Sequence, residues 1–186
     1  GMEYKKAYWD ETIDEHFVER HNHQIFPLLN RRWMFCEVDN FRLYDYYTSE
    51  YDINENVYAY SNRVNSQSSL IIYNNKFANT HGWINHTTSQ ESHQTIFNAL
   101  QLDNNFDFVI YKDIFSNLEY IRSLDDVQQL GFEFELNAYQ SKVLVDFRLI
   151  KDDKWHSYRQ LNAFLNGIGV PKIEEALKEL LLKPVQ

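Results

Sequence analysis

The clearest pattern in the chain is a pair of neighbouring segments with different hydrophobic signatures. Over residues 57–63, small or apolar positions alternate with tyrosine and polar positions, which is typical of a strand with one buried face. Over 70–75 the chain is largely apolar and β-branched, which indicates a strand buried on both faces. The polar residues 65–69 between them have turn chemistry. Together these segments predict a β-hairpin at the heart of an antiparallel sheet.

Further strand patterns flank this hairpin. In the segment 132–136 the glutamates Glu133 and Glu135 alternate with two phenylalanines and a leucine, so we expect both glutamates to face solvent rather than to perform acid–base chemistry. The other expected strands lie at 41–48, 83–88, 106–111, 118–122 and 142–150. This number of strands indicates a β-rich domain.

The N-terminal residues 3–40 have helical spacing. Thr12 and Glu15 have the spacing of a capping box, which predicts a helix start there. Pro27 suits the first turn of a second helix, because the N–H that proline lacks has no partner at that position. No long polar linker comes after it, so we expect this segment to pack on the sheet.

The C-terminal residues predict two more helices. Asp152 or Asp153 is placed to cap a helix over 155–165, and 173–182 has the clearest amphipathic period in the chain. Shorter helical segments are expected at 95–102 and 123–127, and Gly131 is placed to end the second of them.

The charge balance narrows the class of partner. The 186 residues carry a formal net charge of −9 without a cluster of lysine and arginine, so we expect neither nucleic acid nor an anionic membrane as a partner. No apolar run approaches the roughly 20 residues that cross a bilayer. Cys36 is the single cysteine, which fits a reducing compartment and predicts a cytoplasmic location. Its place among apolar helical residues predicts a buried, inert thiol.

The histidines are candidate metal ligands. His16, Glu19 and His23 would share one helix face, but a zinc site needs three or four ligands with supporting hydrogen bonds. A charged, solvated helix face explains the same residues and is favoured. Three further histidines lie in or near expected loops without a ligand spacing: His81, His86 and His93. We therefore expect no metal and no cofactor.

An acidic, tyrosine-rich stretch is the candidate ligand-binding region. Carboxylates beside aromatic rings are typical of sugar sites, and Asp45, Asp52 and Glu55 lie close in sequence to several tyrosines. Tyrosines of an edge strand beside a solvated acidic loop explain the same pattern and are favoured. The candidate ligand-binding residues are Tyr44, Asp45, Tyr47 and Tyr51. Neither a Gly-x-Ser-x-Gly elbow nor a glycine-rich phosphate loop is present, so no catalytic residue is assigned.

Four motifs carry a family resemblance. The strand pattern 57–63 ends in Arg63, and the apolar pattern 70–75 ends in asparagine. Later in the chain come Asp-Ile-Phe-Ser-Asn at 113–117 and Leu-Asn-Ala-Tyr at 136–139. Three residues separate the second of these motifs from Val-Leu at 143–144. In order and spacing over 56–147 these motifs resemble the all-β C-terminal domain of α-amylase-superfamily glycoside hydrolases. The chain departs from that family's pattern at Asn117, where glycine is usual, and at Asn137, where proline is usual.

The flanking segments extend the resemblance. Residues 3–11 and 25–29 resemble the segment that joins barrel to C-terminal domain in large bacterial α-amylase-like proteins, and 173–179 resembles the segment on the C-terminal side of that domain. The resemblance implies an antiparallel β-sandwich over 41–150, a helical segment over 1–40 that packs on it and a helical pair over 151–186. The family's catalytic acids lie on a (β/α)8 barrel, and no barrel motif is present here. The implied function is therefore a non-catalytic accessory domain.

That role also implies three partners. They are the (β/α)8 barrel of the same or a neighbouring polypeptide, an oligosaccharide, and a second copy of the chain bound through the N-terminal helices. The expected interface residues are Tyr8, Trp9, Phe17, Leu29 and Trp33. Two alternatives stay open. One is a freestanding protein–protein interaction module without a carbohydrate role, and the other is a small hydrolase that uses the region of Asp45, Asp52 and Glu55.

Overall fold

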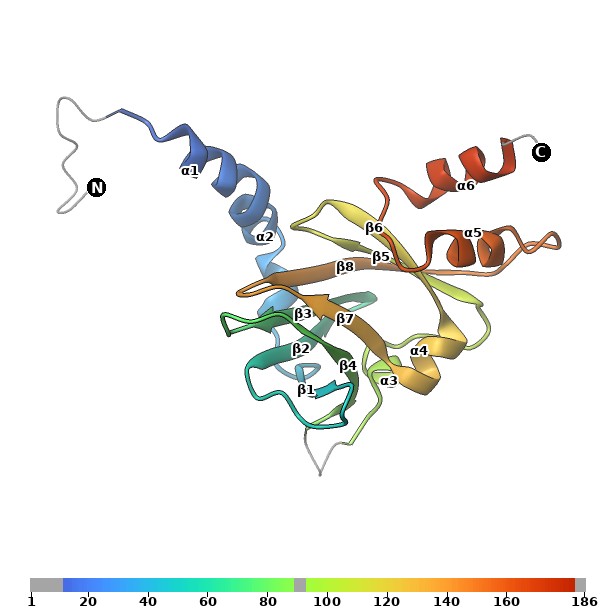
Figure 1. The fold of residues 1–186 in the computed structure, drawn as a ribbon, viewed down its shortest axis with the longest axis horizontal. Helices are drawn as coiled ribbons and strands as arrows, with labels where there is room; N and C mark the ends of the chain where they lie inside the picture. The colour runs from blue at the N-terminus through green and yellow to red at the C-terminus, as the bar shows by residue number, and fades with distance from the viewer. Residues whose placement is uncertain (1–11, 89–92, 183–186) are drawn as a thin grey trace.

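The protein is mainly antiparallel β-sheet with helices at both ends of the chain (Figure 1). The computed structural model describes residues 12–88 and 93–182. Within these ranges eight strands form one sheet in the order β6-β5-β8-β3-β2-β1-β4-β7, with antiparallel pairing throughout. The strands are β1 (Arg42–Thr48), β2 (Val57–Val64), β3 (Gln67–Asn74), β4 (Thr80–Thr87), β5 (Phe108–Asp113), β6 (Leu118–Ser123), β7 (Phe132–Leu136) and β8 (Ser141–Ile150).

The sheet curls on itself. The terminal strands β6 and β7 lie at opposite ends of the strand order, yet both line the same cavity. Irregular pairing bends the ribbon where β1 meets β4 and where β5 meets β8. The predicted mainly-β class with flanking helices is confirmed. Among the described residues, one continuous curled sheet stands where two separately packed sheets were expected.

The predicted central hairpin is β2 and β3. Val64 pairs with Gln67, so the turn contains only two residues, and Asn65 adopts the left-handed conformation (φ 54°) that asparagine tolerates. The predicted polar turn was too long at its C-terminal end, because Ser68 and Ser69 belong to β3 and are buried. Their hydroxyls donate to the carbonyl oxygens of Leu100 and Asn62. Hydrogen bonds to backbone carbonyls thus let these two serines occupy a buried strand.

Both faces of the sheet are covered. The inner face carries the largest apolar cluster, to which alternate residues of β7 and β8 contribute, such as Phe134 and Leu144. The outer face carries two smaller clusters. In one, Val145 packs with Met34 from the N-terminal segment, and in the other, Ile121 packs with Leu161 from a C-terminal helix. The alternation of strand residues between these clusters explains why β3 and β8 are largely apolar on both sides.

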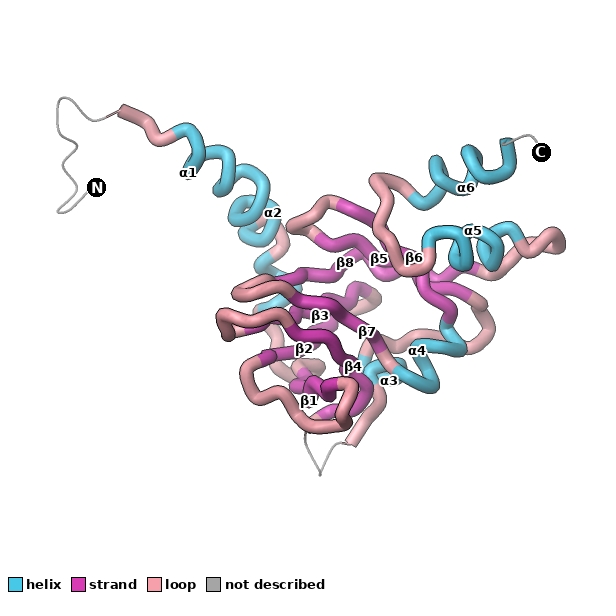
Figure 2. Tube along the Cα trace, in the orientation of Figure 1, coloured by secondary structure: helices cyan, strands magenta, loops and turns pink. Residues whose placement is uncertain are grey.

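Two short helices from the middle of the chain lie beside each other at one end of the sheet, and the terminal helices lie at its other sides (Figure 2). The N-terminal helical segment contains α1 (Glu15–Arg20), a π-helical turn (His21–Ile25), α2 (Phe26–Leu29) and a 3₁₀ turn (Arg32–Phe35). The others are α3 (Ile96–Ala99), α4 (Leu124–Leu130), α5 (Ser157–Leu165) and α6 (Ile173–Leu182). None of the helices in the described part of the chain combines the length and apolar character that a bilayer crossing requires.

The helix starts were predicted with mixed success. Asp14, rather than Thr12, caps α1, because its carboxylate accepts hydrogen bonds from the N–H groups of His16 and Phe17. Both Asp152 and Asp153 act before α5, where they accept the N–H groups of Tyr158 and Ser157 respectively. The Asp153 carboxyl has a pKa below its ordinary value, chiefly because the Ser157 N–H stabilises its charged form.

Candidate functional site

The predicted tyrosine-rich ligand site does not converge in space. Tyr44 is a core residue whose hydroxyl lies 2.6 Å from the Ser61 hydroxyl, so its expected role at a ligand surface is corrected. Because side chains alternate along β1, Asp45 faces the opposite side of the sheet from Tyr44 and is half-buried. Tyr51 lies in the loop that follows the strand and is 88% exposed. Tyr47, also half-buried, pairs with Trp83 of β4. Asp52 and Glu55 are exposed loop residues.

The histidines occupy ordinary environments. His16 and His23 lie on the N-terminal helical segment, which is largely exposed. His86 and His93 stack with ring centroids 4.9 Å apart. Residues 12–88 and 93–182 contain no group of three or more His, Cys, Asp or Glu side chains that could hold a metal ion. Cys36 is exposed, contrary to the prediction of a buried thiol, because the 3₁₀ turn before it points Met34 into the core instead.

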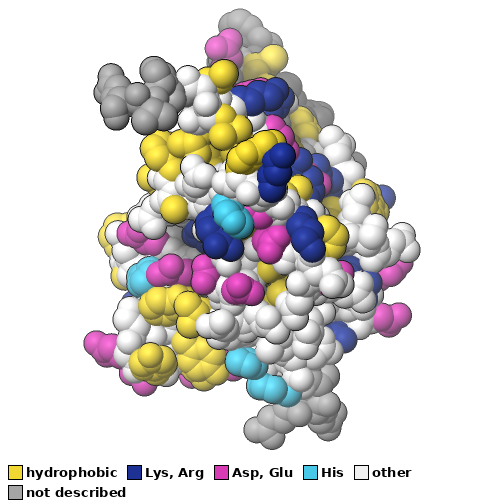
Figure 3. All heavy atoms as spheres, turned by 90° about the vertical axis from the view of Figure 1, so that its right-hand side faces the viewer, with side chains coloured by type: hydrophobic (Ala, Val, Ile, Leu, Met, Phe, Trp, Pro, Cys, Tyr) yellow, Lys and Arg dark blue, Asp and Glu magenta, His cyan; other side chains and the backbone are white. Residues whose placement is uncertain are grey.

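A cavity with a volume of about 550 Å³ lies at the seam between the edge strands β6 and β7. The loop from α5 to α6 closes one side of it. The face that carries these helices shows charged side chains of both signs among exposed apolar ones (Figure 3). The lining residues are His81, Tyr111, Tyr120, Arg122, Glu133, Phe134, Glu135, Asn137, Gln140, Lys142, Leu144, Asn166, Gly167, Ile168 and Gly169.

One wall of this seam cavity is acidic and lies on β4 and β7. The ring nitrogen Nε2 of His81 lies 2.7 Å from a carboxylate oxygen of Glu133. The same imidazole makes an edge contact with the Trp83 ring, with centroids 4.8 Å apart. Glu135 lies two residues further on the same face of β7 and is exposed, as the alternating pattern predicted.

The opposite wall is basic and aromatic. Tyr111 of β5 and Tyr120 of β6 are paired across the strands and stack at 5.6 Å. The Lys142 ammonium lies 5.9 Å from the centre of the Tyr120 ring. Burial raises the pKa of Tyr111 to about 12, partly offset by the positive charge of Arg122. This wall therefore offers two cations and two phenol rings to the cavity.

Two glycines let the α5–α6 loop close the cavity. Gly167 has φ +85°, and a Cβ atom there would lie 2.7 Å from the Arg122 guanidinium. A Cβ at Gly169 would lie 2.6 Å from the Tyr120 ring. The backbone of Val170 holds the loop in place by exchanging hydrogen bonds of 2.7 and 2.9 Å with Glu119 of β6. The positive φ favours glycine at 167, and a side chain at 169 would have to displace the Tyr120 ring.

A second candidate surface is the N-terminal helical segment, which projects away from the sheet (Figure 1). No side chain of α1, the π-helical turn or α2 is buried. Of the expected interface residues, Phe17, Leu29 and Trp33 are 59%, 53% and 44% exposed. Tyr8 and Trp9 lie outside the described residues.

The base of this segment is firmly attached. Arg31 donates two hydrogen bonds, of 2.6 and 2.9 Å, to the carboxylate of Asp146, which protrudes from an irregular position in β8 (φ 57°). Burial of Met34 against the outer face of the sheet adds an apolar anchor. The helical segment 15–35, called the arm below, thus presents exposed apolar side chains while its C-terminal end is attached to the sheet.

Residues of the resemblance motifs hold the turns. Asn74 is buried at the end of β3, and its side-chain amide donates to the carbonyl oxygens of Ala78 and Asn137 at 2.7 and 2.9 Å. Asp113, also buried, accepts the N–H groups of Phe115 and Val143 and the hydroxyl of Ser116. Two motifs that are far apart in sequence are therefore in direct contact.

Sequence patterns did not locate the seam cavity, since its lining comes from five strands and two loops. A scan of the chain against protein-family models finds no match, and a search of curated proteins finds no similar sequence. The geometry of the cavity and of the projecting arm is therefore the basis for a functional proposal.

Proposed function

We propose that this chain is a non-catalytic accessory domain of an α-amylase-like carbohydrate-active protein, and that its N-terminal arm packs against the catalytic (β/α)8 barrel. The curled sheet would supply a stable body, and the arm would supply the apolar contact. The catalytic acids of the resembled enzymes belong to the barrel, so no activity is assigned to this chain.

The observation that carries the proposal is the exposed apolar arm. The side chains of Phe17, Leu29 and Trp33 are exposed to solvent. Arg31 and Met34 nevertheless attach the C-terminal end of the same segment to the sheet. Exposed apolar side chains gathered on one element are typical of an interaction surface. Aromatic anchors such as Phe17 and Trp33 are the residue types that contribute most to interfaces.

The turn contacts give independent support. In the resembled domain the motifs recur in a fixed order, and here Asn74 and Asn137 from two of them touch. Asn117 adopts a left-handed conformation (φ 58°) at the position where that family usually has glycine. A conformation that favours glycine is what the family pattern would require at this turn.

The proposal is tested first by the genomic context and then by binding. We expect an α-amylase-family barrel to be encoded in the same or a neighbouring reading frame. The exposed Cys36 lies next to the arm and accepts an environment-sensitive fluorophore. Addition of that barrel is expected to change the fluorescence saturably, and the variant Phe17→Asp/Trp33→Asp is expected to abolish the change. The absence of an encoded barrel, or binding that the double variant leaves intact, would contradict the proposal.

The alternative is a freestanding protein–protein interaction module. The same arm favours it, because its exposed residues suit any apolar partner. The two functions differ in their relation to carbohydrate. An accessory domain of a carbohydrate-active protein is expected to work beside glycan, whereas an unrelated interaction module has no reason to bind one.

A further inference from the structure

We infer that the seam cavity between β6 and β7 is a binding site for a neutral, polyhydroxylated ligand, namely a short oligosaccharide. The cavity was not among the residues that the sequence suggested, and it is separate from the N-terminal arm. The inference rests on the proposed function only for the choice of an α-glucan as the first probe. The site itself is inferred from the polar groups, the charge and the size of the cavity.

One buried hydroxyl that lines the cavity has no hydrogen-bond partner in the described part of the chain. Tyr111 is only 3% exposed, yet its hydroxyl makes no hydrogen bond to any other residue in 12–88 or 93–182. Within the same ranges the half-buried Arg122 and the exposed Glu135 make neither a side-chain hydrogen bond nor an ion pair, so both can bond a ligand in place of water. Buried polar groups in folded proteins are nearly always hydrogen-bonded. The Tyr111 hydroxyl lacks such a bond among the described residues, which leaves it available to a ligand in the cavity.

The charges of the cavity are balanced. Two cations, Arg122 and Lys142, line one wall, and two carboxylates, Glu133 and Glu135, line the other. An anion that paired with the cations of one wall would be repelled by the carboxylates of the other wall. A cation that paired with the carboxylates would be repelled by Arg122 and Lys142. A hydroxyl group both donates and accepts a hydrogen bond. A ligand with several hydroxyls can therefore satisfy both walls without introducing a net charge.

The size and closure of the cavity also suit a small molecule. The cavity volume of about 550 Å³ lies within the range of small-molecule sites, which is about 300–1,000 Å³. The amides of Asn137 and Gln140 add donors and acceptors at its rim. The close approach of Gly167 and Gly169 to Arg122 and Tyr120 sets the position of the loop wall. These features describe a preformed, polar recess rather than a packing defect.

The test compares two tyrosine-to-phenylalanine variants of the full chain. Tyr111→Phe removes the unpartnered hydroxyl, and Tyr44→Phe removes one that is bonded to Ser61 away from the cavity. Maltotriose, cellotriose and inorganic phosphate are titrated by calorimetry. We expect maltotriose to bind saturably and Tyr111→Phe to weaken its affinity about three- to tenfold, as the loss of one hydrogen bond implies. Thermal stability should not fall in Tyr111→Phe, because the hydroxyl bonds no other residue in 12–88 or 93–182.

A second pair of variants tests the acidic wall. Glu135→Gln should weaken maltotriose binding, whereas Glu175→Gln, an exposed change on α6, should leave it unchanged. Binding of neither saccharide, or tighter binding of phosphate than of maltotriose, would overturn the inference. Equal binding by Tyr111→Phe and the wild type would overturn the assignment to this cavity. If the chain binds no saccharide but its arm still docks on the barrel, only the inference about the cavity is refuted. If it binds saccharide but the arm does not dock, only the accessory role is refuted.

Discussion

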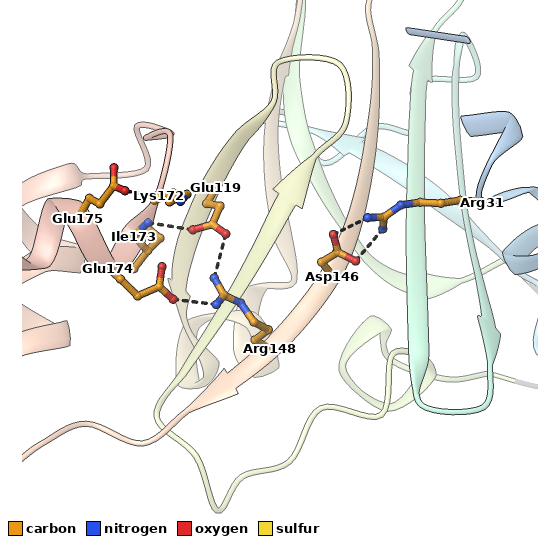
Figure 4. Close-up of polar contacts among 8 residues, drawn as sticks. All are labelled: Arg31, Glu119, Asp146, Arg148, Lys172, Ile173, Glu174 and Glu175. Atoms are coloured by element: carbon orange, nitrogen blue, oxygen red, sulfur yellow. Dashed lines mark hydrogen bonds and ion pairs between the residues drawn. The ribbon is translucent and has the colours of Figure 1, made fainter. Parts of the chain in front are cut away.

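The Glu119 carboxylate on β6 accepts a hydrogen bond of 2.8 Å from the backbone N–H of Ile173, the first residue of α6 (Figure 4). Its other oxygen accepts a 2.9 Å bond from Arg148, whose guanidinium also donates to Glu174 at 2.7 Å. A side chain of the sheet thus caps a helix that begins 54 residues later. This contact and the adjoining backbone pairing of Val170 hold the C-terminal helices, and hence the cavity loop, on the edge strand.

We predict that Glu119→Ala lowers the free energy of unfolding by about 1–2 kcal/mol, because a helix cap and a charge-assisted bond are lost together. Amide exchange in α6 should accelerate more than exchange in β2 and β3. The matched control is Glu175→Ala, whose carboxylate makes only an exposed 3.6 Å ion pair with Lys172. Its effect should stay within about 0.5 kcal/mol. Equal effects of the two changes in urea unfolding would refute the cap.

Buried tyrosines predict a loss of stability at alkaline pH. Burial raises the pKa of Tyr44, Tyr46 and Tyr111 to about 12, whereas an exposed tyrosine in the unfolded chain has a pKa of about 10. Between these values the unfolded chain loses protons that the folded chain retains. The stabilisation is therefore fully present below about pH 10 and is lost as the pH rises toward about 12.

Ultraviolet difference spectroscopy of the phenolate band measures this effect. We expect a group of tyrosines to ionise late and together with unfolding, and Tyr44→Phe to reduce the amplitude of that late phase. A single non-cooperative titration of all tyrosines near pH 10 would show that these side chains are not buried as described.

The turn after β5 predicts a stabilising substitution. Asn117 has φ 58°, a conformation that glycine adopts without the steric cost of a Cβ atom. Asn117→Gly should raise the free energy of unfolding by about 0.5 kcal/mol. The control is Asn98→Gly within α3, where glycine should instead lower the free energy of unfolding by about 0.3 kcal/mol. A loss of stability in Asn117→Gly, measured by urea denaturation, would contradict the assigned backbone geometry.

Much of the fold could be predicted from local patterns. Alternation placed Phe132 and Phe134 inside and Glu133 outside, and the amphipathic period gave α6 its bounds. Those patterns depend on neighbours in sequence, so they are visible without the fold. The cap of α1 was misplaced at Thr12, because Asp14, two residues later, offers a carboxylate that accepts the N–H groups of His16 and Phe17.

The candidate site could not be predicted in this way. The pairing of His81 with Glu133 and the approach of Gly167 to Arg122 join residues more than 40 positions apart. They depend on how far the sheet curls, which is set by irregular pairings such as the one near Asp146. The proximity of Asp45 to tyrosines in sequence was misleading, since alternation turns Tyr44 into the core.

The most direct test of the docking role is sedimentation velocity of the isolated chain over a range of concentrations. Without its barrel, the apolar arm should drive reversible self-association, so the weight-average sedimentation coefficient should rise with concentration. Phe17→Asp/Trp33→Asp should abolish that rise, and Tyr51→Asp, an exposed change outside the arm, should preserve it. A wild-type chain that stays monomeric at every concentration and sediments like the double variant would contradict the claim that the arm is a docking surface.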